Sequence, residues 1–141
     1  MIKLLETKDL TRWSQMCADV YPDTTAEQML AEYHEGRFPN DYGYYLNDIL
    51  VAFISLSVRN DYVNGCETSP VGFVEGIYID SDYRKQGIAR ELVEFAKGWS
   101  KEKGCQELAS DILIDNLDSL AFHEAVGFEE KERVICVSMK I

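Results

Sequence analysis

The sequence predicts a single α/β (α+β) domain in which helices flank a mixed central β-sheet. Apolar segments of strand length alternate along the chain with segments whose apolar residues recur at helical spacing. A composition of 46% hydrophobic and 11% aromatic residues is typical of a folded domain. The 141 residues suffice for one sizeable core and include no repeat or linker, so we treat residues 1–141 as one unit.

A short strand and two helices are predicted first. Ile2 to Leu5 is an apolar run of strand length, and Asp9 to Val20 places its apolar residues at helical spacing. Thr24 and Glu27 have the spacing of a capping box, which predicts a second helix that ends at Gly36.

A β-hairpin is predicted next. Tyr42 to Asn47 and Leu50 to Val58 have strand patterns. The turn falls at Asn47-Asp48, because both residue types tolerate a positive φ. The polar, glycine-containing segment from Arg59 to Pro70 is predicted to be a loop.

The second half of the chain continues the alternation. Phe73 to Ile79 is an apolar strand, and a long helix follows that extends through Arg90 to Lys103, with Gly104 at its end. Three further elements are predicted: a strand at Glu107 to Ile112, a helix at Asn116 to Val126 stopped by Gly127, and late strands within Phe128 to Met139.

The charge of the chain is strongly acidic, with 14 basic and 25 acidic residues and a net charge of −11. Such a surplus favours solubility, repels nucleic acid and anionic membranes, and attracts cationic ligands to any acidic cleft. The sequence contains no segment of the signal-peptide kind and none of membrane-spanning length. We therefore expect a cytoplasmic protein whose partners include neither nucleic acid nor a membrane.

The cysteines and histidines do not predict a metal site. The four cysteines are far apart and include no Cys-x-x-Cys pair, so we expect reduced, mostly buried thiols rather than a disulfide framework or zinc. The two histidines are also widely separated. These residues are Cys17, Cys66, Cys105, Cys136, His34 and His123.

The segment after the strand Phe73 to Ile79 has the features of an anion site. A turn leads into Arg84 to Ala89, which opens a helical pattern. The first N–H groups of a helix lack intrahelical partners, and the helix dipole places partial positive charge there. Gly87 has no Cβ, so its backbone can approach a phosphate or take a positive φ. Arg-x-x-Gly alone is typical of ordinary helix entries, but in this context a pyrophosphate would suit the loop.

Two segments resemble the GCN5-related N-acetyltransferase (GNAT) family. Arg84-Lys85-Gln86-Gly87-Ile88-Ala89 is similar to its Arg/Gln-x-x-Gly-x-Gly/Ala signature, which holds the pyrophosphate of coenzyme A. Asn116 with Ser119 to Phe128 resembles its Asn-x-x-Ala-x-x-Leu-Tyr-x-x-x-Gly-Phe segment. The resemblance implies the GNAT fold and acetyl-coenzyme A as co-substrate, without a metal. It implies coenzyme contacts from Ile77, Tyr78, Ile79, Arg84, Lys85, Gln86, Gly87, Ile88, Ala89, Arg90 and Asn116.

His123 stands where that family carries a tyrosine near the coenzyme sulfur. An imidazole titrates near neutral pH and can serve as a general acid, so His123 is a catalytic candidate for protonating the thiolate. The alternative is a structural histidine at the rim of a helix, with no part in the chemistry.

Within that family, the chain is most similar to the aminoglycoside 6′-N-acetyltransferases of the bacterial resistance type. The resemblance implies acetyl transfer to the 6′-amine of aminoglycoside antibiotics and a homodimer. Four segments carry it: Asp61 to Cys66, Val74 to Ile77, Ala109 to Asp111, and Gly127 to Val134. The implied substrate contacts are Tyr21, Tyr62, Glu75, Asp111 and Glu132.

The chemistry of the reaction supports this set of residues. An aminoglycoside is a polycation, and Glu75, Asp111 and Glu132 lie in or beside apolar strand-like segments, where a carboxylate is costly unless it is functional. Glu75 is the predicted base, taking a proton from the substrate ammonium directly or through water. Backbone N–H groups at Ile77 to Ile79 are predicted to stabilise the oxyanion.

Alternatives remain open for single residues and for the whole chain. Asp111 also fits an ordinary strand end, and Glu75 an outward-facing edge position. The same coenzyme loop would serve an enzyme that acetylates another cationic amine, such as a polyamine or a peptide N-terminus. It would also serve a non-catalytic acyl-coenzyme A sensor, which needs the loop but not the carboxylates.

Overall fold

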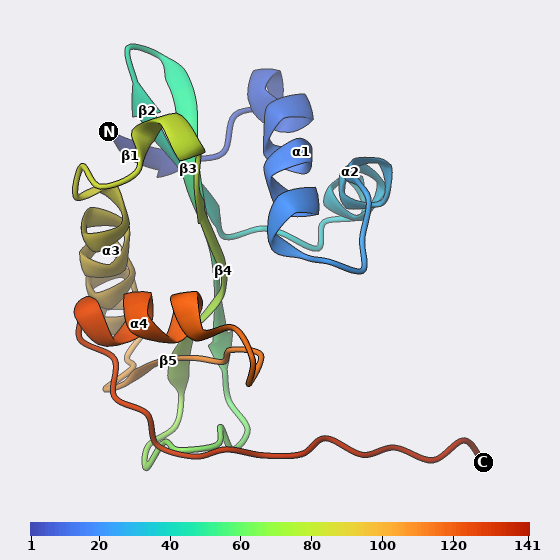
Figure 1. Cartoon of the computed structure of the whole chain (residues 1–141), viewed down its shortest axis with the longest axis vertical. Helices are drawn as coiled ribbons and strands as arrows, with labels where there is room; N and C mark the ends of the chain where they lie inside the picture. The colour runs from blue at the N-terminus through green and yellow to red at the C-terminus, as the bar shows by residue number, and fades with distance from the viewer.

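A five-stranded mixed sheet runs through the centre of the protein (Figure 1), described here from a computed structural model covering residues 1–141. The strand order is β1-β2-β3-β4-β5; β1 to β4 pair antiparallel, and β5 pairs parallel to β4. The mixed sheet predicted from the sequence is confirmed. The strands are β1 (Ile2–Leu4), β2 (Asp41–Leu46), β3 (Ile49–Arg59), β4 (Val71–Ile79) and β5 (Leu108–Ser110).

Helices cover both faces of the sheet. In Figure 1, α1 and α2 lie on one side, whereas α3 lies on the other with α4 beside β5. Short 3₁₀ turns at Thr7–Asp9 and Ser81–Tyr83 precede α1 and α3. The helices are α1 (Leu10–Val20), α2 (Ala26–His34), α3 (Ile88–Glu102) and α4 (Leu117–Ala125). None of the four helices has the length and hydrophobicity that a membrane span requires.

The capping box of α2 lies one residue later than predicted. Thr25 rather than Thr24 is the N-cap, and its hydroxyl accepts from the N–H of Gln28 at 3.2 Å. The side chain of Gln28 accepts in return from the N–H of Thr25 at 3.1 Å. Because two threonines stand side by side, the motif fits either register, and the reciprocal bonds select Thr25 with Gln28 over Thr24 with Glu27.

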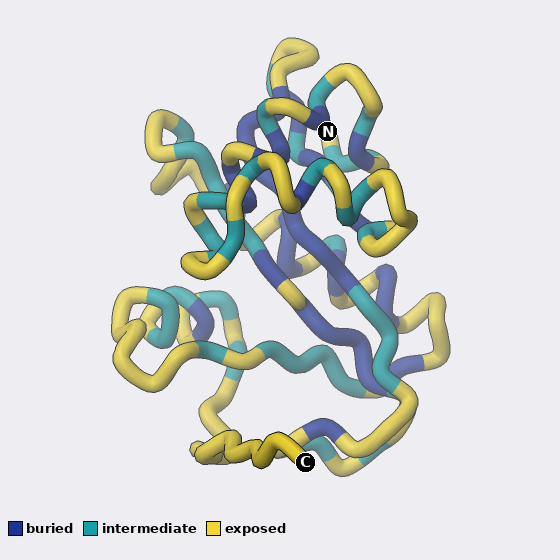
Figure 2. Tube along the Cα trace, turned by 90° about the vertical axis from the view of Figure 1, so that its right-hand side faces the viewer, coloured by how far each residue is buried: buried dark blue, intermediate teal, exposed yellow.

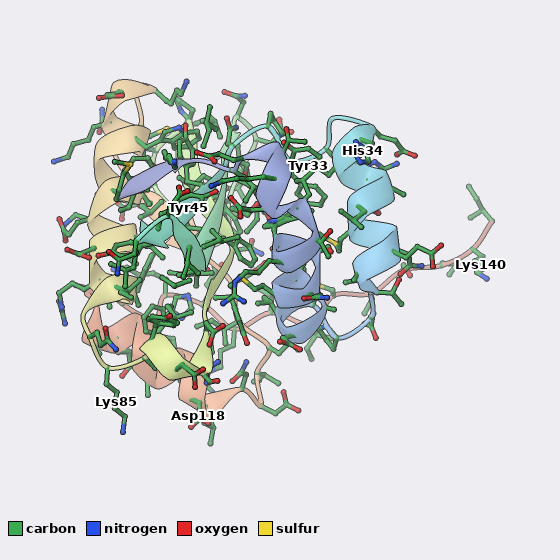
Figure 3. All side chains as sticks on the ribbon, turned by 90° about the horizontal axis from the view of Figure 1, so that it is seen from above. Tyr33, His34, Tyr45, Lys85, Asp118 and Lys140 are labelled. Carbon is green, nitrogen blue, oxygen red and sulfur yellow. The ribbon has the colours of Figure 1, made fainter.

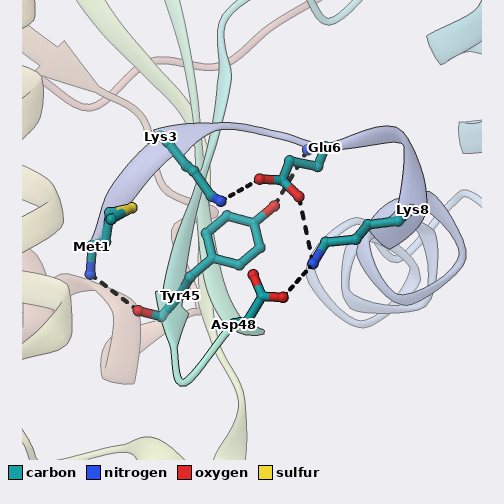
Figure 4. A network of polar contacts seen from close by, with 6 residues as sticks. All are labelled: Met1, Lys3, Glu6, Lys8, Tyr45 and Asp48. Atoms are coloured by element: carbon teal, nitrogen blue, oxygen red, sulfur yellow. Dashed lines mark hydrogen bonds and ion pairs between the residues drawn. The ribbon is translucent and has the colours of Figure 1, made fainter.

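The predicted hairpin is confirmed, and an ion-pair network ties it to the N-terminus. Asn47 and Asp48 take φ values of 49° and 64° at the turn. The Nζ of Lys8 contacts Asp48 Oδ2 at 2.8 Å, and the backbone N–H of Glu6 donates to the Tyr45 hydroxyl at 3.3 Å (Figure 4). These contacts hold the start of the chain against the β2–β3 hairpin.

Two apolar clusters form the core, one on each face of the sheet. Trp13, fully buried on α1, packs edge-on against Phe53 of β3 and against rings from α2 and the loop after it. Leu92 and Trp99 of α3 pack on the other face against β3 and β4. The central strands β3 and β4 are therefore buried along most of their length (Figure 2), whereas β1 and β5 contain no fully buried residue.

The predicted strands within Phe128 to Met139 are wrong for this chain taken singly. Residues 128–141, which we call the C-terminal segment, pair with no strand. Phe128 packs against the core cluster of α3 and against His123, and the chain beyond it runs to an end that lies away from the sheet (Figures 1 and 2). The alternation that predicted a strand runs through Val134, Cys136 and Ser138, which are all exposed, because no neighbouring strand lies against them. The apolar residues Ile135, Val137 and Met139 are 91%, 88% and 86% exposed for the same reason.

Candidate active site

A cleft of about 880 Å³ opens on the face of the sheet covered by α1 and α2. Its walls come from the end of α1, from α2 and the loop after it, and from the middle of β3 and β4. The residues with polar side chains in its lining include Tyr21, Asp23, Thr24, Gln28, Glu32, Arg37, Asn40, Ser55, Ser57 and Glu75. Two of the five predicted substrate residues, Tyr21 and Glu75, therefore share one cleft.

A β-bulge turns Glu75 towards this cleft. Ser55 of β3 pairs with Gly76, whereas the next residue, Leu56, pairs with Val74. Glu75 is thus the extra residue of β4 and has no partner on β3. Bulges of this kind re-aim a side chain and are frequent beside active sites. The bulge explains how a carboxylate is exposed within an otherwise buried strand.

Two residues of β3 hold the carboxylate of Glu75. The Oγ of Ser57 donates to Oε1 at 2.7 Å. Nη2 of Arg59 donates to both carboxylate oxygens at 2.9 Å, and its Nε donates to Oε1 at 3.2 Å. Glu75 is therefore oriented by charge-assisted bonds rather than free in solvent.

Tyr21 reaches the backbone of β4 next to Glu75. A Cβ placed on Gly76 would lie 2.0 Å from the Tyr21 hydroxyl oxygen, so only glycine leaves room for this side chain. Burial raises the pKa of Tyr21, and the nearby carboxyl groups of Asp41 and Glu75 add to the effect. The phenol therefore stays protonated at neutral pH and can donate a hydrogen bond.

A buried carboxyl group lies beneath the cleft. Asp41 of β2 is 3% exposed, and its Oδ2 accepts from Trp13 Nε1 at 2.9 Å. Burial raises the pKa of Asp41 to about 7, although hydrogen bonds from Ser55 and Trp13 oppose the shift. Its Oδ1 is buried without a hydrogen-bond partner. A buried carboxylate oxygen without a partner disfavours the charged form, which agrees with a carboxyl group that is partly protonated at neutral pH.

The loop between β4 and α3 has the backbone geometry of an anion site. Gly87 is the N-cap of α3 with a φ of 82°, and Lys85 has a φ of 62°. Glu91 is the first residue of α3 whose N–H donates to a backbone carbonyl, so the N–H groups of residues 88–90 have no acceptor. An added Cβ on Gly87 would meet no atom within 4 Å, so the surface in front of this helix end is open.

The basic side chains of this loop point in different directions. Lys85 projects from the domain into solvent (Figure 3). The Nε of Arg84 donates to the Ile79 carbonyl at 3.0 Å, which folds its side chain over the end of β4. Nη2 of Arg90 donates to the Ala125 carbonyl at 2.9 Å and ties α3 to α4.

The edge of β4 beside Glu75 is open on the side away from β3. β5 pairs with β4 only over residues 72–74 and then diverges. Beyond Val74, the predicted residues Ile77, Tyr78 and Ile79 pair with β3 and have no strand on their other side. This leaves backbone N–H groups available between the cleft and the anion loop.

Asn116 and His123 lie on α4. Asn116 caps that helix, because its Oδ1 accepts from the Ser119 N–H at 3.2 Å. His123 is buried; its Nδ1 lies 2.7 Å from the Ser119 carbonyl, and its Nε2 lies 3.2 Å from the hydroxyl of Ser110 on β5. A carbonyl oxygen can only accept, so Nδ1 carries a proton, and in the single chain His123 links α4 to β5.

The other three predicted substrate residues do not line the cleft of a single chain. Tyr62 lies in the loop after β3 and is 74% exposed, and Asp111 is exposed just beyond β5. Glu132 is exposed on the C-terminal segment. A smaller pocket of about 310 Å³ between α3, β5 and the end of α4 contains none of the predicted site residues.

The cysteines are all free thiols with different surroundings. Cys17 and Cys105 are buried, Cys66 is half-buried and Cys136 is exposed on the C-terminal segment. Burial raises the pKa of the first three thiols. None of these three is an activated nucleophile, because activation requires a lowered pKa.

Sequence reasoning missed Ser57, Arg59 and Asp41 as contributors to the site. Ser57 falls within a predicted strand, and Arg59 falls at the start of a predicted loop. Ser57 and Arg59 alternate at the end of β3, so both lie on the face that carries Glu75. This relation can be recognised only once the pairing of β3 with β4 is known.

Comparison with known proteins yields one family and a consistent set of relatives. The Acetyltransferase (GNAT) family matches residues 7–128. An aminoglycoside N(6′)-acetyltransferase type 1 of Serratia marcescens is 41% identical over 96% of this chain and 95% of its own length. The protein of that name from Acinetobacter haemolyticus is 37% identical over 99% and 98%.

Solved structures agree with these relatives. The crystal structure of the aminoglycoside antibiotic 6′-N-acetyltransferase AAC(6′)-IG from Acinetobacter haemolyticus superposes with a TM-score of 0.92 and 35% identity, covering 100% of this chain and 99% of that one. AAC(6′)-Iy in complex with the bisubstrate analogue CoA-S-monomethyl-acetylneamine gives a TM-score of 0.89 at 33% identity, with coverage of 100% and 98%. The predicted GNAT fold is confirmed.

Proposed function

Because the chain belongs to the acetyltransferase (GNAT) family, we infer that it transfers the acetyl group of acetyl-coenzyme A to the 6′-amine of an aminoglycoside antibiotic. The observation that carries this proposal is the position of Glu75. Its carboxylate lies in a large cleft, on the strand that leads into an anion-binding loop. Full-length relatives named as aminoglycoside N(6′)-acetyltransferases support the choice of substrate.

The residues present fit coenzyme A. Gly87 has open space in front of it, and the unpaired N–H groups of Ile88, Ala89 and Arg90 point out of the same helix end. These groups would hold the pyrophosphate, with Lys85 and Gln86 beside it and Asn116 on the neighbouring helix. When bound, the coenzyme supplies the acetyl thioester. The open edge of β4 at Ile77 to Ile79 would orient the acyl carbonyl through backbone N–H groups.

The cleft would bind the substrate amine and would also provide the general base. The substrate amine arrives mainly as an ammonium ion and must lose a proton before it can attack. Glu75 would accept that proton, directly or through water. Tyr21, held protonated beside Glu75, would donate to a hydroxyl of the sugar. The role of His123 as general acid stays a prediction, since its ring nitrogens contact Ser119 and Ser110 in the single chain.

A steady-state assay across amine classes tests the proposed function. The chain is incubated with acetyl-coenzyme A and, in turn, a kanamycin-type aminoglycoside, a gentamicin-type aminoglycoside, a polyamine and a peptide with a free N-terminus. We expect the highest kcat/KM for an aminoglycoside and NMR of the product to place the acetyl group on the 6′ nitrogen. Preference for the polyamine or peptide would assign a different amine substrate, and coenzyme binding without turnover would indicate a sensor.

We also propose that the active form is a homodimer in which the C-terminal segment lies on a second copy. Its apolar residues Ile135, Val137 and Met139 are 91%, 88% and 86% exposed, so nothing in the single chain covers them. β5 is an edge strand whose outer side has no partner. Reciprocal exchange of the segment between two copies would cover both and would carry Glu132 to the partner.

Truncation tests this arrangement. Light scattering should give a dimer for the full chain and a monomer for a variant that ends at residue 132. A truncated chain that remains dimeric would place the interface elsewhere, and a monomeric full chain would exclude the homodimer.

A further inference from the structure

Arg59 contacts Glu75, although it neither lines the cleft nor belongs to the predicted coenzyme-binding residues. Arg59 is the last residue of β3 and lies two residues beyond Ser57, so both side chains emerge on the face that carries Glu75. Arg59 does not line the cleft, whereas Ser57 and Glu75 do. Its guanidinium therefore approaches the carboxylate from outside.

The guanidinium of Arg59 is anchored. Its Cζ lies 3.4 Å from the centroid of the Phe73 ring, and Phe73 is only 2% exposed. A cation over an aromatic face gains stabilisation, and the planar fork of arginine loses little freedom when it then binds a carboxylate. Arg59 is thus a fixed donor rather than a mobile surface charge.

The bonds are shared unequally between the two carboxylate oxygens of Glu75. Oε1 accepts from Ser57 Oγ and from Nε and Nη2 of Arg59, whereas Oε2 accepts only from Nη2 of Arg59. A carboxylate oxygen has about two lone-pair positions, so Oε1 is saturated and Oε2 keeps acceptor capacity. One oxygen holds the group in place, and the other is left for a ligand.

We propose that Arg59 is a positioning residue that fixes the Glu75 carboxylate by Oε1 and reserves Oε2 for the ammonium group of the substrate. This inference rests on the proposed function, because it assigns the orientation of the same base. In a cleft of about 880 Å³, an unheld glutamate would sample several rotamers, and small misplacements of a catalytic group reduce turnover strongly. Fixing one oxygen leaves a single direction from which the amine can meet the base.

Variants at Arg59 test the proposal. Arg59→Met keeps an apolar stem over Phe73 but has no donors, and it should lower kcat by about tenfold to a hundredfold while leaving the Kd of acetyl-coenzyme A unchanged. Arg59→Lys keeps the charge but cannot form the fork, so it should recover only part of kcat. Lys97→Met, which removes a charge paired with Glu94 on the outside of α3, should retain the parental kcat.

A double-mutant cycle completes the test, together with the direction in which Arg59→Met changes aminoglycoside affinity. In a Glu75→Gln background, Arg59→Met should cause no further loss of kcat, because the carboxylate that it positions is gone. A folded Arg59→Met variant with parental kcat would overturn the proposal. Tighter aminoglycoside binding with undiminished kcat would also overturn it, since Arg59 would then compete with the substrate. A parent chain that acetylates none of the amines would refute the proposed function itself.

Discussion

Under the proposed function, the loop before α3 and the Glu75 cleft would recognise opposite charges by different means. The loop that begins α3 offers an anion its backbone: a left-handed Gly87 and first-turn N–H groups without acceptors. The cleft offers a cation a side chain, Glu75, held by Ser57 and Arg59 from the neighbouring strand. The loop needs only a short run of consecutive residues, whereas the cleft is assembled from α1, α2, β3 and β4. Substitutions in the loop should therefore affect mainly the binding of the coenzyme. Substitutions in the cleft should alter the positions of several neighbouring side chains.

The largest effect is expected at Gly87. Gly87→Glu adds a side chain at a positive φ and a negative charge in front of the helix N-terminus, so coenzyme binding should fall below detection by calorimetry. Gly104→Glu is the matched control, because Gly104 has a φ of 84° and open space at the other end of α3. Undiminished coenzyme affinity in a folded Gly87→Glu variant would separate the loop from the coenzyme.

A smaller effect is expected at Gly76 on the cleft side. Gly76→Ala places a Cβ against the Tyr21 hydroxyl and should displace that ring, raising the KM for an aminoglycoside by about tenfold. The Kd of acetyl-coenzyme A should change little. Gly98→Ala on α3, where an added Cβ meets no atom within 4 Å, controls for the methyl group itself. Equal KM values in the two variants would remove Tyr21 from substrate recognition.

Added salt should weaken aminoglycoside binding in the cleft several-fold more than it weakens coenzyme binding at the loop. Aminoglycoside binding joins opposite formal charges in a partly wet cleft, where each contact contributes on the order of 1 kcal/mol and is screened by ions. Coenzyme binding depends more on backbone N–H groups, so its Kd should rise less with added salt. Asp111→Asn and Glu132→Gln should each raise the KM for the aminoglycoside if these carboxylates reach the substrate in the dimer. Parental KM values in both variants would assign recognition to the Glu75 cleft alone.

The smallest effect concerns stability and the buried acid beneath the cleft. The pKa of Asp41 rises from 3.8 to about 7 on folding, so between these pH values the folded protein binds one more proton than the unfolded chain. The contribution of Asp41 to stability therefore falls as pH rises through this range and levels off above it. Asp41→Asn should flatten the dependence of urea unfolding between pH 5 and 8 and raise stability at pH 8. A parent whose stability rises steadily over that range would contradict the assignment.

Local patterns predicted most of the fold and the backbone geometry of the loop before α3. The hairpin at Asn47-Asp48, the helices and the glycine at the start of α3 each depend on a few neighbouring residues, so the sequence alone sufficed. The capping box was predicted one residue too early, because Thr24 with Glu27 has the same spacing as the observed pair Thr25 and Gln28. The alternation within Phe128 to Met139 predicted strands, but a strand also needs a neighbour, and in the single chain these residues pair with none.

The cleft could be predicted only in part. Tyr21 and Glu75 do line one cleft, but the family resemblance supplied them. Ser57, Arg59 and Asp41 were missed, because their relation to Glu75 and Tyr21 depends on strand register and on the bulge in β4. Such contacts arise between residues far apart in sequence and leave no local signal.

The most direct test of the central claim is Glu75→Gln, examined for both ligands and for turnover. If Glu75 is the base of the cleft and independent of the loop, kcat should fall by about 10²-fold, the usual scale for loss of a general base, and the acidic limb of the pH–rate profile should vanish. The Kd of acetyl-coenzyme A should equal that of the parent. A folded variant with parental kcat, an unaltered pH–rate profile and only a raised KM for the aminoglycoside would contradict the account, leaving Glu75 as a binding group.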